Sequence, residues 1–161
     1  MTDREEEITA WHESGHAFVA AWLGAIVESV SIDPDADDGP HRFGDIIVRW
    51  DPDRFSNREI AEKSVLVALS GPVTEMIHRD EPLHPATVSE WSQDWSLAWT
   101  AADFIRDQRK RMAHLEQACR ELYHLLSQDH HWAAIGAIVD HLLAYETLEG
   151  ETVHEIVSEW T

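Results

Sequence analysis

The stretch His12-Glu13-Ser14-Gly15-His16 decides how the fold and the chemistry of this chain are read. It lies within residues 8–23, where apolar residues recur at the spacing of one helix face. Residues four apart on an α-helix lie on the same face, so His12 and His16 can direct two imidazole nitrogens to one point. Neutral imidazoles are good ligands for Zn²⁺, and Glu13 can reach a water bound to that ion. The stretch therefore predicts a helix that carries an H-E-x-x-H metal motif.

The rest of the chain predicts a mainly α fold with a small β-hairpin near this helix. Residues 27–32 alternate apolar and polar, and residues 45–50 supply a second strand that pairs with them. A capping box, Ser56-x-x-Glu59, opens a further helix, which Pro72 is expected to kink or split. We expect the remaining helices at residues 92–126 with a break near residue 108, at 132–145 and at 151–160. No repeat or linker is apparent, so residues 1–161 are predicted to form a single domain.

The overall charge narrows the classes of partner. The 161 residues include 31 acidic and 12 basic residues, which give a formal net charge of -19. Such a surface repels nucleic acid and anionic lipid, so neither is expected as a partner. The apolar run at residues 17–27 is too short to cross a bilayer, no signal peptide is visible, and Cys119 is the single cysteine. These features predict a protein of the cytoplasm that does not insert into membranes.

A catalytic zinc ion usually takes three protein ligands, and the helix supplies two of them. The third must come from farther along the chain, since Val19 and Trp22 stand where one common continuation of the motif has Gly and His. Spacing alone leaves four candidates open, namely Glu75, His84, Glu90 and Asp94.

Residues 9–17, T-A-W-H-E-S-G-H-A, resemble the T-A-Y-H-E-A-G-H-A signature of the FtsH-type zinc peptidases. These peptidases form the proteolytic domain of membrane-anchored, ATP-dependent AAA+ proteases. Four further segments resemble family motifs in the same order, so that the likeness covers nearly the whole chain: residues 30–34 (V-S-I-x-P), 69–75 (L-G-G-R-x-A-E), 92–98 (S-N-D-L-x-x-A) and 142–151 (L-L-x-x-E-T-L-D-G-E).

The resemblance implies a zinc metalloendopeptidase that binds one Zn²⁺ per chain and hydrolyses peptides or unfolded polypeptides. His12, His16 and Asp94 would be the metal ligands, and Glu13 would be the general base. Glu75 is either an outer partner that orients a histidine or a solvated carboxylate. An edge strand would hold extended substrate by strand addition, and its candidate residues are Asp45, Ile46, Ile47 and Val48. A purely structural hairpin is the alternative for that strand.

The chain also departs from the resembled family. It contains no Walker A motif, Pro72 stands in place of an arginine, Trp95 replaces a smaller residue, and residues 33–38 form an unexpected acidic loop. The alternative function is therefore a metal-binding but weakly active module that works with a separate unfoldase. A third hypothesis is a helical domain whose H-E-x-x-H is incidental. A homo-oligomer or a separate ATPase partner is compatible with the sequence.

Overall fold

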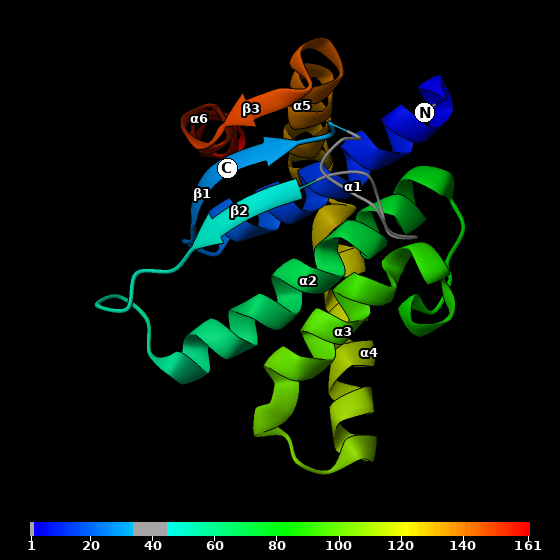
Figure 1. Ribbon diagram of the computed structural model, residues 1–161, viewed down its shortest axis with the longest axis vertical. Helices are drawn as coiled ribbons and strands as arrows, with labels where there is room; N and C mark the ends of the chain where they lie inside the picture. Colours follow the sequence, from blue (N-terminus) through cyan, green and yellow to red (C-terminus); the bar gives the residue numbers. More distant parts are fainter. Residues whose placement is uncertain (1, 34–44) are drawn as a thin grey trace.

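The computed structural model describes residues 2–33 and 45–161, and it confirms the mainly α fold with a small sheet (Figure 1). Most of the acidic loop at residues 33–38, and Pro34 of the V-S-I-x-P match, lie outside the described residues. The elements, in chain order, are α1 (Asp3–Trp22), β1 (Ile26–Ser31), β2 (Asp45–Arg49), α2 (Asn57–Arg79), α3 (Ser92–Ala101), α4 (Gln108–Leu126), α5 (Asp129–Tyr145), β3 (Thr147–Glu149) and α6 (Gly150–Trp160). Three short 3₁₀ turns, η2 (Pro85–Thr87), η3 (Ser89–Trp91) and η4 (Ala102–Phe104), flank α3.

The sheet is antiparallel with the strand order β2-β1-β3. Val30 of β1 lies opposite Ile46 of β2 on one side and Leu148 of β3 on the other. The β1–β2 pair is the expected hairpin, whereas β3 was not predicted, because three residues are too few to show an alternating pattern. Helix α1 packs against β1 and β2, and α6 packs against β1 and β3. In the described chain, β2 therefore forms an edge of the sheet beside α1.

Helix α1 is the central element, since it contacts α2, α5, α6 and the sheet (Figure 1). It begins five residues earlier than the apolar pattern suggested, because Thr2 and Glu5 form a capping box at its start. Gly15 allows α2 to approach closely. A Cβ atom at this position would meet the side chain of Thr74 and lie 2.8 Å from the carbonyl oxygen of Ser70. Because of this close approach, the face of α1 that carries the histidines packs against the middle of α2.

Helix α2 starts as predicted, with the Ser56 hydroxyl accepting from the Glu59 amide and the Glu59 carboxylate accepting from the Ser56 amide. The predicted split at Pro72 is wrong, because α2 continues without interruption to Arg79. Pro72 itself is buried, in a part of α2 that packs against α1 and α3. Tertiary packing therefore outweighs the loss of one backbone hydrogen bond.

Helix α3 follows the buried indole of Trp91, which is 1% exposed and anchors the chain just before the helix begins. Asp94 consequently lies in the first turn of α3, facing α1 and α2. Among the described residues, no helix combines the length and the apolar character needed to cross a membrane.

Candidate metal centre

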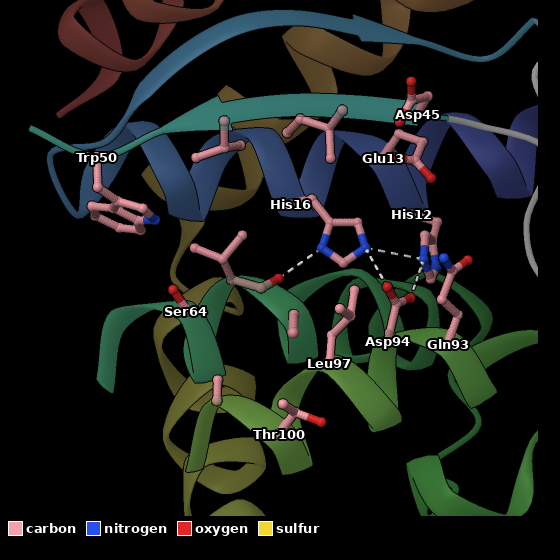
Figure 2. A pocket seen from close by; sticks show the side chains of 15 residues that line it. His12, Glu13, His16, Asp45, Trp50, Ser64, Gln93, Asp94, Leu97 and Thr100 are labelled. Carbon is pink, nitrogen blue, oxygen red and sulfur yellow. Dashed lines mark hydrogen bonds and ion pairs between the residues drawn. The ribbon is translucent and has the colours of Figure 1, made fainter. Parts of the chain in front are cut away.

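His12 and His16 lie on the buried face of α1 and point to the same place (Figure 2). Their exposed fractions are 2% and 5%, and their Nε2 atoms are 3.2 Å apart. This convergence follows from the spacing of four residues, which stacks the two side chains one helical turn apart. Helix α1 therefore supplies two buried nitrogen ligands at one point.

Asp94 reaches the same point from α3. Its Oδ2 atom lies 2.7 Å from Nε2 of His12, and its Oδ1 atom lies 3.4 Å from Nε2 of His16. Ligands about 2.0–2.1 Å from a tetrahedral zinc ion are separated from one another by roughly 3.3 Å, which is close to two of these three distances. The three side chains offer ligand atoms that all lie within 4.8 Å of one another, so this group could hold a metal ion.

Each imidazole is oriented by a second contact on its other nitrogen. Nδ1 of His12 lies 2.9 Å from Oε1 of Glu75, a carboxylate with no exposed surface. Nδ1 of His16 lies 2.6 Å from the carbonyl oxygen of Val67. Because a carboxylate and a carbonyl only accept, both Nδ1 atoms must donate, so Nε2 is the nitrogen of each ring that can bind a metal once its own proton is displaced.

Gly71 on α2 provides the space in front of these nitrogens. A Cβ atom built there would meet Nε2 of His16 and would lie 2.7 Å from Nε2 of His12. Any larger residue would therefore fill the position toward which both nitrogens point. The donor set and this space are compatible with a bound metal ion.

The buried charges are strongly coupled. Burial lowers the pKa of His12, but the nearby carboxylates of Asp94 and Glu75 outweigh it and raise the pKa to about 10. The pKa of His16 is also raised, since the attraction of Asp94 exceeds the effect of burial. The pKa of Asp94 is lowered despite burial, because His16 and His12 stabilise its charge. A metal ion bound here would replace protons on the two imidazoles.

Glu13 lies beside this cluster and is 4% exposed. Burial raises the pKa of its carboxyl group, the charges of His16 and His12 oppose this rise, and Asp94 and Asp45 add to it. A carboxyl group with a raised pKa that lines a cavity is a candidate for proton transfer.

A cavity of about 490 Å³ opens next to the cluster (Figure 2). His12, Glu13, His16 and Asp94 lie on its wall, and β2 forms another side of it. The remaining lining residues are Asp45, Ile46, Val48, Trp50, Ser64, Val67, Ala68, Gln93, Leu97, Thr100 and Ala101. Of the four substrate-strand candidates, Ile47 does not line the cavity, and its side chain is 48% exposed. Ile46 and Val48 face the cavity because side chains alternate along a strand, and Asp45, at the first position of β2, lines it as well.

Among the described residues, the other candidates for a third ligand do not belong to the group that could hold the metal. Glu75 faces Nδ1 of His12, on the far side of the ring from the cluster. His84 pairs with Glu116 at 3.1 Å and lines a different cavity. Glu90 is in η3 and does not line the cavity.

Sequence reasoning missed the part played by Gly71 and the presence of Gln93 and Trp50 on the cavity wall. Gly71 did carry a signal. A glycine inside a helix costs about 1 kcal/mol relative to alanine, so its presence there indicates a packing reason. Gln93 and Trp50 carried no comparable signal, because their roles depend on how α3 and β2 meet.

Comparison with protein-family models and with curated proteins finds no match to this chain. The function of the site is therefore inferred from its own geometry and chemistry.

Proposed function

We propose that this protein is a zinc-dependent metallopeptidase that resembles the FtsH-type peptidase domains and acts on peptides or unfolded polypeptides. One observation carries the proposal. His12 and His16 present two oriented nitrogens to the carboxylate of Asp94, and Glu13 lies beside them in an open cavity. Buried groups of this kind, with perturbed pKa values and a mutual arrangement suited to one reaction, are characteristic of active sites.

His12, His16 and Asp94 would hold the zinc ion. When bound, zinc supplies Lewis acidity, which lowers the pKa of water at the site and polarises a peptide carbonyl. Two imidazoles and one carboxylate with an open position match the ligand sets of catalytic rather than structural zinc. The expected stoichiometry is one Zn²⁺ per chain.

Glu13 would act as the general base and then as the general acid. Its carboxylate takes a proton from the attacking water and gives it to the leaving amine nitrogen. The raised pKa of Glu13 makes its carboxylate a stronger base than an ordinary glutamate, which favours the first of these transfers. Glu75 and the Val67 carbonyl keep both imidazoles in the orientation that this chemistry needs.

The outer edge of β2, which pairs with no other strand in the described residues, would bind the substrate. An extended peptide added to this edge would run along the cavity wall, next to Glu13 and the metal ligands. Main-chain hydrogen bonds of this kind hold a peptide with little regard to its sequence. Folded proteins rarely offer such a segment, so the expected substrates are peptides or chains unfolded by a separate partner.

The test compares the parent protein with Glu13→Gln, using zinc content and the cleavage of casein, an unstructured protein. We expect both proteins to hold one zinc, while the variant cleaves casein about 10² to 10⁴-fold more slowly. Glu7→Gln is the matched control, since Glu7 lies on the same helix, is 51% exposed and is outside the cavity. Zinc without cleavage in any of the three proteins would instead support the interaction module. Absence of bound zinc would overturn both functions.

A further inference from the structure

The cavity beside the metal cluster has two unlike ends. Figure 2 shows Asp45 next to Glu13 at one end, and Trp50 at the other. The other lining residues include the apolar or small side chains of Val48, Ala68 and Leu97. Among the described lining residues there are three carboxylates and no lysine or arginine. The carboxylates of the described cavity wall therefore lie near the metal cluster, and the indole of Trp50 lies at the opposite end.

The three carboxylates differ in their interaction partners. Asp94 is bound to the two histidines, and Glu13 is the proposed base. Asp45 is exposed at the start of β2, and no hydrogen bond or ion pair of its side chain is found within the described residues. Its negative charge acts on Glu13, where it is one of the smaller causes of the raised pKa after burial. Asp45 is thus a solvent-accessible charge, close to the reacting groups, with no structural partner in the described chain.

Asp45 also lies on the strand edge along which substrate is expected to bind. A peptide paired with β2 would place some of its side chains, or its amino terminus, near this carboxylate. A cationic group there would gain a charge partner, and the described residues of the cavity wall include no lysine or arginine that would compete for it. The formal net charge of -19 acts in the same sense, because it attracts positively charged peptides to the protein.

We infer that Asp45 is a specificity-determining residue, which binds a cationic group of the substrate at the acidic end of the cavity. The inference rests on the proposed peptidase function and narrows its substrate class to basic peptides. The cation is either a lysine or arginine side chain or the α-ammonium group of the peptide. Both are recognised by the same carboxylate.

The test measures peptide binding to the zinc-loaded Glu13→Gln protein, so that hydrolysis is not required. Three N-acetylated decapeptides share their apolar residues and carry Lys, Gln or Glu at every second position, which makes the result independent of binding register. A fourth peptide repeats the Gln sequence with a free amino terminus. Each is also measured on proteins that carry Asp45→Asn, or Asp53→Asn as a control. Asp53 is exposed, lies outside the cavity, and its substitution changes the net charge equally.

We expect the Lys peptide to bind roughly tenfold more tightly than the Gln peptide, and the Glu peptide to bind more weakly than both. Asp45→Asn should remove most of the preference for Lys, while Asp53→Asn should keep it. If the free amino terminus increases the binding affinity of the Gln peptide and Asp45→Asn abolishes this increase, the α-ammonium group is the cation. The inference would be overturned if the ratio of the binding affinities of the Lys and Gln peptides were the same with and without Asp45, or if no peptide bound. Cleavage of casein by the parent protein, measured in parallel, separates that result from failure of the proposed function.

Discussion

Two pairs of neighbouring histidines in this protein show that proximity alone does not make a metal site. His12 and His16 converge at 3.2 Å and share the carboxylate of Asp94. His130 and His131, at the start of α5, have ring centroids only 4.1 Å apart. Among the described residues, however, the group able to hold a metal includes only the first pair.

The difference lies in direction and in surroundings. Adjacent residues on a helix point about 100° apart, so His130 is exposed while His131 is buried and its Nδ1 faces the carbonyl oxygen of Leu125. Residues four apart point the same way, and here α2 and α3 add acceptors and a third ligand around them. A metal site thus needs nitrogen lone pairs that point to one position and enough space for an ion at that position. Substitutions at the neighbours of His12 and His16 can remove each of these, and matched substitutions elsewhere in the chain serve as controls.

The largest effect is expected from filling the space in front of the first pair. Gly71→Ala would place a methyl group against both Nε2 atoms, so the two rings would have to move from their present positions or α2 would have to move away from them. Because two ligands are displaced, zinc affinity should fall by more than the roughly 100-fold upper bound for loss of an outer contact. Zinc titration with a competing chelator measures this effect.

Gly136→Ala is the matched control on α5, where the nearest atom to an added Cβ lies 3.8 Å away. This substitution should leave zinc affinity unchanged and stabilise the fold by about 0.5–1 kcal/mol, since alanine is the better helix former. Equal zinc affinity in both alanine variants would show that Gly71 does not make room for the ion.

An intermediate effect is expected from weakening the orientation of His12. In Glu75→Gln the side chain keeps its shape but loses the charge that holds Nδ1–H of His12. Zinc affinity should fall about 10- to 100-fold, while the ligands themselves remain in place. Isothermal titration of zinc into the metal-free protein gives the value. Glu116→Gln serves for comparison, because it removes the charge beside the half-exposed His84, and it should change zinc affinity little.

The smallest effect concerns pH. Since the pKa of metal-free His12 is raised to about 10 and that of His16 is raised as well, zinc must displace protons near neutrality. Zinc affinity should therefore rise with pH, by about tenfold per pH unit for each proton displaced. Titrations at pH 6, 7 and 8 check this slope, and a flat profile would contradict it.

The stability of the metal-free protein should change in the opposite direction. The raised pKa of His12 adds stability that is fully present below its ordinary value of 6.5 and is lost as pH rises toward about 10. Thermal unfolding of the metal-free protein should consequently shift to lower temperature as pH rises over that range.

Much of this arrangement is encoded locally, and some of it is not. The spacing of His12 and His16 and the capping box at Ser56 predicted their helices, because both depend on residues within one or two turns. Asp94 is 82 positions from His12, and it was selected from four candidates only by resemblance to a known family. Pro72 was expected to kink or split its helix, whereas the structure shows one continuous helix in which the preceding glycine faces the cluster. The role of Gly71 depends on how closely α1 and α2 pack, and no short stretch of sequence determines that distance.

The most direct test of the metal centre is X-ray absorption spectroscopy at the zinc edge on dialysed, zinc-loaded protein. We predict one zinc per chain with nitrogen and oxygen ligands only, including the scattering pattern of two imidazoles. Failure to retain zinc, or a sulfur ligand from Cys119, which lines a different cavity, would contradict the ligand set of His12, His16 and Asp94.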